Sequence, residues 1–463
     1  MHKSTTSKRK LPDTWLVVFF ILVVIAILTW VVPSGSFDYE TIDIDGTARK
    51  VAIAGSYHEI SKSEVSATGL LGLFASLYEG CVSAADIIFV IMTCAATFGV
   101  IVKTGAFHAF IGRVVQKNGS RSLILIPVLM LVFGLGGSLF GMLSEFYGFY
   151  PLIVGLMMAL GYDAMTGFAT IALGEYVGFM AATLNPYTVA VAQSIAGVQL
   201  YSGIGYRAVC FVVLMGAAVA YLMLYARKVR RKPELSVVYG DSCTHSFERS
   251  QLDSYTFTWR HTLILLDVLA TLVILMMGMI RWKWGYKELC GLFIIMSAVA
   301  ALIDKWSPND YCQEMLAGIR SVVWGCILTG LVIMNHAQIM DTIIYALGNL
   351  LEKAPSAISA QLMLVAHTLI NFLIPSGSGQ AAATMPIMAP LADVLGVSRQ
   401  VACLTFQFGD GLSNLLWPTC GIVIICGLGD VHYDRWLKWF GKLFLILFAA
   451  QMVLVEIAVL TGF

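Results

Sequence analysis

Long stretches without acidic or basic residues limit this chain to a narrow set of folds. About 20 consecutive apolar residues cross the core of a bilayer as a helix. Stretches near or above this length are Trp15 to Val32, Ile87 to Val102, Ser122 to Leu143, Tyr176 to Tyr206, Ala208 to Tyr225, Ser321 to Met340 and Ala354 to Ala392. Only 12% of the 463 residues are charged, against about 25% in a soluble domain, which excludes a soluble globule, a disordered chain and a nucleic-acid binder. We predict an all-α polytopic protein of the lipid bilayer with about 9–11 transmembrane helices.

The distribution of basic residues predicts the orientation of the chain, because cytoplasmic segments are rich in Lys and Arg. The tail before the first apolar stretch is basic, the loop from Ser34 to Ser66 is acidic, and residues 227–232 are basic again. We therefore expect an inner-membrane protein in which residues 1–66 hold a cytoplasmic tail, the first transmembrane helix and an outward loop. Residues 228–261 are expected to form a cytoplasmic linker.

An internal repeat relates the segments on either side of this linker. Pro151 matches Pro386, Leu160-Gly161 matches Leu395-Gly396 and Gly174-Glu175 matches Gly409-Asp410, each pair 235 residues apart. Duplicated halves are a common plan of secondary transporters. We assign residues 67–227 to repeat 1 and residues 262–463 to repeat 2.

Each repeat contains a stretch that is unusual for a membrane helix. Residues 134–141 are rich in Gly, and Pro-Ser-Gly-Ser-Gly-Gln at 375–380 interrupts an uncharged run of 39 residues, too long for one crossing. We predict re-entrant hairpins near 134–160 and near 375–395, whose irregular backbone would line a central binding site. The alternative is that Gly and Ser only allow close helix packing.

Three acids, Glu145, Glu175 and Asp410, lie among apolar neighbours, where a charge is costly. We expect them to compensate the charge of a coupling cation, Na⁺ or H⁺; the alternative is that they are protonated hydrogen-bond donors. We expect no basic residue at their depth, except Arg399 at a hairpin mouth. The candidate solute ligands are Ser376, Gly377, Ser378, Gly379, Gln380, Asn185, Asn414 and Thr419. A Na⁺ site is expected among Asn185, Thr188, Asn414, Ser378 and Asp410, since hydroxyl, amide and carboxylate oxygens suit this ion.

Specific motifs resemble a known carrier family. The segments Asn371 to Ala381, Met385 to Asp393, Gly396 to Gln400 and Phe408 to Gly411, together with Asn414, resemble YfcC-type carriers, which are grouped with the four-carbon dicarboxylate carriers of the ion transporter superfamily. The segments Phe98 to Val100, Lys103 to Ala106, Leu160 to Asp163 and Asn185-Pro186 resemble the same family. More distantly, the Ser376 to Gly379 hairpin and Gly409 to Asn414 resemble the aminobenzoyl-glutamate transporters.

The resemblance implies an elevator-type fold with inverted repeats and a homodimer. It also implies that the solute is either a dicarboxylate or a basic amino acid, as in arginine/ornithine exchangers. Two positions depart from the family pattern: Ser144 stands where a second acid is expected, and Leu328 where an Arg is expected. We expect a secondary active transporter, symporter or exchanger, of a small carboxylate-bearing metabolite. An amino acid is slightly favoured, because buried acids repel a doubly negative solute; a Na⁺- or H⁺-coupled dicarboxylate transporter is the alternative.

Three other classes of protein remain alternatives. A channel could also use broken helices, and a membrane enzyme or a receptor without flux is a further option. No nucleophile, metal-ligand or phosphate-binding motif is present in the sequence, so we predict that the protein is not an enzyme and needs no cofactor beyond Na⁺ or H⁺.

Overall fold

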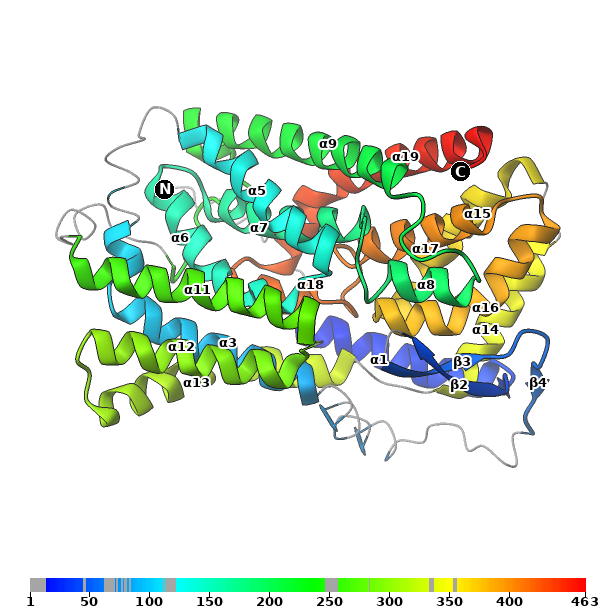
Figure 1. Cartoon of the computed structure of the whole chain (residues 1–463), viewed down its shortest axis with the longest axis horizontal. Coiled ribbons are helices and arrows are strands. Elements are labelled where there is room, and N and C mark those ends of the chain that lie inside the picture. The colour runs from blue at the N-terminus through cyan, green and yellow to red at the C-terminus, as the bar shows by residue number, and fades with distance from the viewer. Residues whose placement is uncertain are drawn as a thin grey trace, which may run out of the picture.

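The computed structural model describes residues 14–44, 47–61, 71, 74–75, 78, 81–82, 85–110, 113, 122–245, 257–282, 284–332, 337–352 and 356–463. The tail expected at residues 1–13 and residues 246–256 of the expected linker lie outside the described residues. The described part is predominantly helical, as predicted, and forms an elongated bundle with a few short strands at one end (Figure 1).

The elements follow one another along the chain as α1 (Thr14–Val31), β1 (Gly35–Ser36), β2 (Tyr39–Ile44), β3 (Thr47–Ala52), β4 (His58–Glu59), α3 (Ala85–Lys103), η1 (Ser122–Ile124), α5 (Leu125–Leu135), η2 (Gly136–Phe140), η3 (Ser144–Phe149), α6 (Tyr150–Ala159), α7 (Ala164–Met180), α8 (Val189–Ile195), α9 (Ile204–Arg231), η4 (Pro233–Leu235), α11 (Trp259–Trp282), α12 (Tyr286–Ile303), α13 (Pro308–Val332), α14 (Ala337–Glu352), α15 (Ser356–Leu373), α16 (Gly377–Val394), α17 (Arg399–Ser413), α18 (Ile422–Leu428) and α19 (Tyr433–Thr461). β1 pairs with β4 and β2 with β3, both antiparallel.

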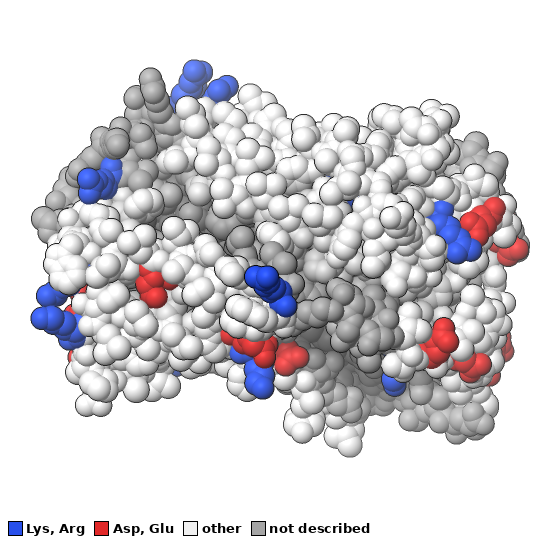
Figure 2. All heavy atoms as spheres, in the orientation of Figure 1, with Lys and Arg blue, Asp and Glu red and all other residues white. Residues whose placement is uncertain are grey.

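The surface of the bundle is apolar over wide areas, as expected for lipid contact. Val212 and Leu224 on α9 and Leu445 on α19 are each more than 60% exposed. Figure 2 shows one face on which charged side chains are sparse. Among the described residues, three helices are long and apolar enough to cross a bilayer, namely α9, α12 and α19. Burying such helices in lipid removes their exposed apolar surface from water.

The helices pack in two groups. In the first group α3 contacts α12 and α13, α11 contacts α12, and α1 contacts α13. The second group contains α5 to α9 and α14 to α19, with α7 and α17 at its centre. The main contacts between the groups are made by η3 on α3 and by α18 on α13. The two groups therefore meet chiefly along one face of the second group.

Each repeat contributes a helical hairpin to the second group. In the first, α5 and η2 lead to a turn at residues 141–143, and η3 and α6 lead back; Gly141 makes the turn with a φ of +69°. In the other, α15 leads to residues 374–376 and α16 returns. The Ser376 hydroxyl caps α16 by accepting a hydrogen bond from the Gly379 N–H. The two hairpins extend from opposite ends of the bundle toward its middle (Figure 1).

A broken helix crosses behind each hairpin. Residues 181–188 separate α7 from α8, and residues 414–421 separate α17 from α18. The freed backbone groups find partners on the neighbouring hairpin: the N–H groups of Thr183 and Leu184 donate to the Ser138 carbonyl at 3.0 and 3.2 Å. On the other side, the Asn371 amide donates to the Asp410 carbonyl at 3.1 Å. Each hairpin thus satisfies the break in its own repeat, which is what an apolar environment requires.

Glycines at matching repeat positions allow each hairpin to cross its broken helix closely. A Cβ on Gly174 would lie 3.0 Å from Phe133 and 3.1 Å from the Met130 carbonyl, and a Cβ on its repeat mate Gly409 would lie 2.7 Å from His367 and 2.9 Å from the Thr368 N–H. Any side chain at these positions would force the helices apart. The repeat seen in the sequence therefore marks the same packing contact twice.

The replacement Gly409→Val is expected to destabilise the protein by about 1–3 kcal/mol, because an overpacked helix crossing cannot relax fully. Thermal unfolding of the detergent-solubilised protein measures this effect. Gly441→Val on α19 is the matched control, since a Cβ there has no atom within 4 Å. Equal loss of stability in both variants would contradict the close crossing.

Candidate solute-binding site

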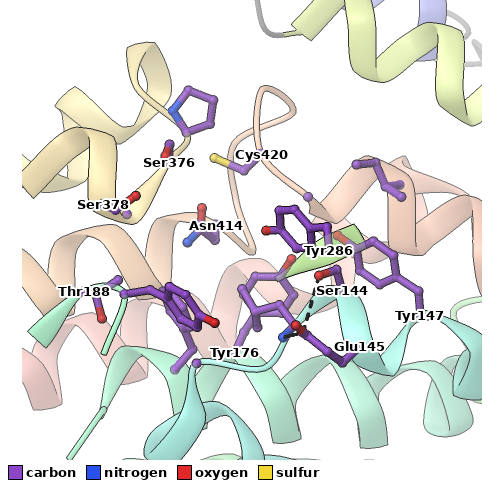
Figure 3. Close-up of a pocket in the computed structure, with 18 of the residues that line it drawn as sticks. Ser144, Glu145, Tyr147, Tyr176, Thr188, Tyr286, Ser376, Ser378, Asn414 and Cys420 are labelled. Carbon is purple, nitrogen blue, oxygen red and sulfur yellow. Dashed lines mark hydrogen bonds between the residues drawn. The ribbon is translucent and has the colours of Figure 1, made fainter. Parts of the chain in front are cut away.

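A cavity of about 390 Å³ lies where the hairpin tips meet the broken helices (Figure 3). Its walls come mainly from residues 141–147 and 375–378 at the tips, residues 187–188 and 414–424 at the breaks and the start of α18, and residues 284–286 at the start of α12. The last segment belongs to the first helix group, and the other four to the second. The cavity is therefore bounded by both groups.

The cavity brings together residues that are far apart in the sequence. Seven of the predicted site residues line it: Glu145, Thr188, Ser376, Gly377, Ser378, Asn414 and Thr419. They come from both of the segments assigned to repeats, residues 67–227 and 262–463. The volume is suited to a small metabolite.

The other predicted site residues lie behind the cavity wall. Gln380 is fully buried, and its amide donates to the His367 carbonyl at 2.9 Å. Gly379 uses its N–H in the cap of α16. The Asn185 side chain accepts a hydrogen bond from the Tyr187 N–H at 2.9 Å and packs against Gly141 at the first hairpin tip. These three residues support the backbone of the site and do not line it.

Glu145 is the only charged side chain among the described lining residues. It is 7% exposed, and one carboxylate oxygen accepts hydrogen bonds from the Leu143 N–H at 2.9 Å and the Ser144 hydroxyl at 3.4 Å (Figure 3). The hairpin tip thus holds the carboxylate in place from one side. A fixed carboxylate at the edge of a partly apolar cavity suits a cationic group of a solute.

Aromatic residues of the wall were missed by sequence reasoning. Tyr147, Tyr176, Tyr187, Trp284 and Tyr286 line the cavity. Their faces and hydroxyls can contact an alkyl chain, an ammonium group or a carboxylate. Tyr147 and Tyr176 stand within two residues of the acids Glu145 and Glu175, and that proximity is the signal that could have identified them. Trp284 and Tyr286 carry no comparable signal.

Asp410 and Thr188 meet just behind the tip of the second hairpin. Among the described residues, neither carboxylate oxygen of Asp410 has a hydrogen bond of normal geometry, although the Asn414 side chain interacts with this carboxylate, and the Thr188 hydroxyl has no partner. A Cβ on Gly377 would lie 2.6 Å from the Thr188 methyl and 3.0 Å from an Asp410 oxygen, so both side chains abut the first turn of α16. The positive end of that helix favours the carboxylate. The same oxygens are suited to a small cation.

Glu175, the repeat mate of Asp410, is also fully buried and does not line the cavity. Its carboxylate accepts a hydrogen bond from the Tyr150 hydroxyl at 2.6 Å, and its second oxygen has no partner among the described residues. The two acids therefore occupy similar places, each in the helix that precedes a break.

The expectation that no basic residue other than Arg399 lies at the depth of the acids is wrong. Arg207 is 1% exposed, and none of its guanidinium nitrogens has a partner among the described residues. Arg207 stands between two uncharged stretches of the sequence, which suggests a boundary between two helices. In the structure α9 begins at Ile204 and places Arg207 in the interior near Cys403. Arg399 forms an ion pair with Asp393 at 2.7 Å between half-exposed side chains. Neither arginine lines the cavity.

Comparison with known proteins places these features in a family context. A model of the C4-dicarboxylate anaerobic carrier family, DcuC, matches residues 11–460. An Escherichia coli K12 protein named "Putative basic amino acid antiporter YfcC" is 31% identical over 99% of this chain and 98% of its own length. An uncharacterized protein of Haemophilus influenzae is 26% identical over 96% of this chain and 97% of its own length.

Two solved transporters are similar over nearly the whole chain. The first is the YdaH transporter of Alcanivorax borkumensis, and the match covers 98% of this chain and 99% of that protein. The second is MtrF of Neisseria gonorrhoeae, and the match covers 98% of this chain and 96% of that protein. Each is 16% identical, with a TM-score of 0.45.

Proposed function

The chain belongs to the C4-dicarboxylate anaerobic carrier family, and within it we propose a secondary active transporter, symporter or exchanger, of a small carboxylate-bearing metabolite. Membership makes the protein a multi-pass membrane transporter and not an enzyme. We further propose that an amino acid is favoured over a dicarboxylate, a basic amino acid included. The relative named as a basic amino acid antiporter is consistent with this choice.

The composition of the cavity wall carries the proposal. Among the described lining residues there is one carboxylate, Glu145, and no Lys or Arg. A solute with two negative charges would meet no opposite charge there and one like charge, which costs free energy at low dielectric. An amino acid instead brings an ammonium or guanidinium group for Glu145. Its carboxylate can face the Ser376 and Ser378 hydroxyls and the first turn of α16.

A coupling cation is proposed beside the solute. Asp410 and Thr188 offer three oxygens without a hydrogen bond of normal geometry among the described residues, and Ser378, Asn414 and Asn185 lie on the adjoining segments. Na⁺ would take oxygens from this set, and H⁺ would be taken by Asp410 itself. Glu175 is proposed to compensate charge in repeat 1. In the alternative, a Na⁺-coupled dicarboxylate transporter, the same oxygens would bind Na⁺, and the positive charge of this ion would lie next to the dianion.

Movement of the two helix groups past each other is the proposed transport step. Because the cavity is bounded by both groups, sliding of the second group along α3 and α13 would expose the solute first on one side and then on the other. In this proposal the two hairpins are re-entrant, the repeats span 67–227 and 262–463 with inverted orientation, and the protein is an inner-membrane homodimer. The N-terminus and the linker 228–261 are placed in the cytoplasm.

Thermal stabilisation of the purified protein tests this function. The panel contains arginine, ornithine, neutral amino acids, succinate and aminobenzoyl-glutamate, each in Na⁺ and in K⁺ buffer. A ligand at about 100 times its Kd adds about 2.7 kcal/mol to the stability of the folded state. Stabilisation by a cationic or zwitterionic amino acid is the expected result. Stabilisation only by succinate, and only in Na⁺, would overturn the amino acid assignment in favour of the coupled dicarboxylate carrier.

A further inference from the structure

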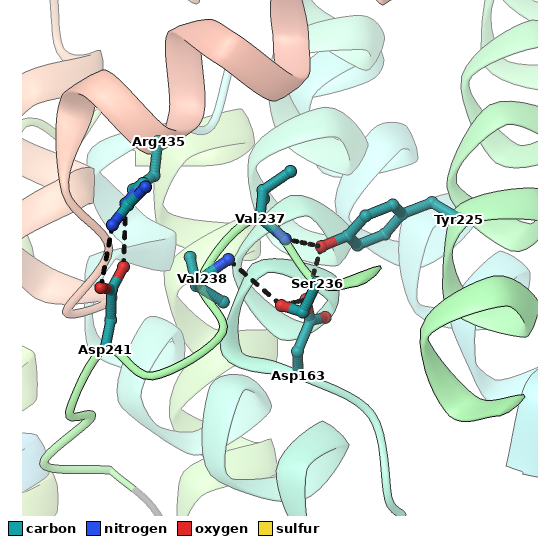
Figure 4. Close-up of polar contacts among 7 residues, drawn as sticks. All are labelled: Asp163, Tyr225, Ser236, Val237, Val238, Asp241 and Arg435. Atoms are coloured by element: carbon teal, nitrogen blue, oxygen red, sulfur yellow. Dashed lines mark hydrogen bonds and ion pairs between the residues drawn. The ribbon is translucent and has the colours of Figure 1, made fainter. Parts of the chain in front are cut away.

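The segment after α9 is fastened to the rest of the protein at several points. Residues 232–245, which we call the strap, run from the end of α9 past the first turn of α7 to the start of α19 (Figure 4). They form the larger described part of the segment that joins the two repeats. A passive connection between two halves needs no specific contacts, so each contact of the strap calls for an explanation.

The first anchor of the strap is Asp163, the residue that caps α7. One carboxylate oxygen accepts hydrogen bonds from the Thr166 N–H at 2.9 Å and the Thr166 hydroxyl at 2.5 Å. The other accepts from the Ser236 hydroxyl of the strap at 2.6 Å and from the Tyr225 hydroxyl of α9 at 2.5 Å. A single carboxylate therefore joins the cap of α7 to the strap, and charged acceptors make the stronger hydrogen bonds.

The strap adds its own backbone to this anchor. The Val238 N–H donates to the Ser236 hydroxyl at 3.1 Å, and the Val237 N–H donates to the Tyr225 hydroxyl at 3.2 Å (Figure 4). The hydroxyl that bonds Asp163 is thus fixed by the backbone two residues later. Such a double arrangement orients the strap as well as attaching it.

The second anchor lies in repeat 2. Asp241 of the strap accepts two hydrogen bonds from the Arg435 guanidinium of α19, at 3.0 and 3.1 Å. Further on, Asp430 in the turn between α18 and α19 accepts from the Thr244 N–H at 2.6 Å and the Thr244 hydroxyl at 3.0 Å. A ring nitrogen of His245 lies 3.0 Å from the Leu428 carbonyl. Burial lowers the pKa of His245, so a neutral ring fits beside that carbonyl.

The two anchors join the broken helix of repeat 1 to the broken helix of repeat 2. α7 is the first half of the broken helix of repeat 1, and α18 is the second half of the broken helix of repeat 2. Thr188, in the break that follows α7, and Asn414, in the break that precedes α18, both line the cavity. α7 begins and α18 ends where the strap passes. The strap between Ser236 and Thr244 therefore links the two broken helices at one end of the molecule, in addition to the direct packing of α7 on α17.

We propose that the strap makes the two broken helices move as one unit during transport, with Asp163, Asp241 and Arg435 as positioning residues. This role rests on the proposed transport function, but the mechanical link itself can be tested without any solute. If the link is real, loosening one anchor loosens the other. If the strap is only a connection, a mutation at one anchor changes hydrogen exchange at that anchor alone.

Hydrogen exchange of the purified full chain tests the link. Ser236→Ala removes the bond to Asp163 but leaves that residue as the cap of α7. We expect the Thr244 amide and the turn between α18 and α19 to exchange about tenfold faster, a coupling of the usual size between distant sites. Asp241→Asn is expected to loosen Val237 and Val238 in return. Faster exchange confined to the mutated anchor in both variants would overturn the proposal.

A transport assay then tests the positioning role. With arginine uptake into proteoliposomes as the probe, the double variant S236A/D241N is expected to lose about tenfold in Vmax while KM stays within about twofold. Glu234→Gln, which neutralises an exposed acid of the same strap, is the matched control. Unchanged Vmax, or loss of arginine binding together with Vmax, would overturn the role. If the wild type takes up no arginine, the proposed solute fails, and the exchange experiment alone decides on the strap.

Discussion

Replacing Asp410 with asparagine is expected to abolish coupled uptake, or to uncouple it from the cation, without unfolding the protein. The carboxylate is fully buried, and among the described residues its oxygens have no hydrogen bond of normal geometry. A bound cation or proton would therefore balance its charge. Loss of one partner of a buried charge pair costs about 2–5 kcal/mol, which lowers cation affinity about 30-fold or more. Uptake driven by an imposed Na⁺ or H⁺ gradient measures this loss.

Protein stability distinguishes a lost cation site from a damaged fold in this variant. Since the substitution D410N would remove an unpartnered buried charge, the thermal midpoint in the absence of ligand is expected to stay the same or to rise. Asp393→Asn is the matched control, because this acid of the same repeat lies at the exposed end of α16 in the ion pair with Arg399. Coupled uptake that persists unchanged in D410N would defeat the assignment.

The second large effect is expected from Glu145→Gln. Because Glu145 is the one charged side chain in the described lining, its neutralisation removes the proposed partner of the cationic group of a solute. Binding of arginine or ornithine is expected to weaken by about 2–5 kcal/mol, whereas a dicarboxylate should bind no worse. The change in solute preference, read from thermal shifts across the panel, is more informative than the loss of affinity alone.

Two comparisons make the Glu145 result specific. Glu314→Gln changes an acid of α13 outside the cavity, and it should leave the thermal shifts as they are in the wild type. Glu145→Asp keeps the charge but shortens the side chain that reaches the Leu143 N–H, so it should retain the preference for cations with weaker binding. Equal weakening for arginine and succinate in E145Q would show that the residue shapes the site without selecting charge.

The sequence predicts the elements with strong local causes. The Pro-Ser-Gly-Ser-Gly segment predicts a turn, and Ser376 caps α16 there. The repeat of Gly174 at Gly409 marks two close helix crossings. Expected ligands such as Ser376, Ser378 and Asn414 meet at one cavity because hairpin tips and helix breaks converge. These features depend on backbone geometry, which small residues and prolines determine locally.

Other features depend on contacts that no local pattern carries. Gln380 was expected to bind solute because it follows the hairpin turn, but one turn of α16 rotates it toward His367. Trp284 and Tyr286 reach the cavity only because the first helix group packs against the second. Arg207 appears in the sequence as the boundary of two apolar stretches, and only the start of α9 at Ile204 shows that it is buried. Tertiary packing decides each of these cases.

The division of the cavity wall between two helix groups has a consequence for inhibitor design and for evolution. A compound wide enough to contact both residues 284–286 and the hairpin tips would hold the two helix groups in one arrangement, even if the compound did not resemble the solute. Conversely, exchange of the short α11–α12 turn between relatives could change the range of accepted solutes while the repeats stay intact. The turn thus offers a separable module on which natural variation or engineering can act without disturbing the duplicated core.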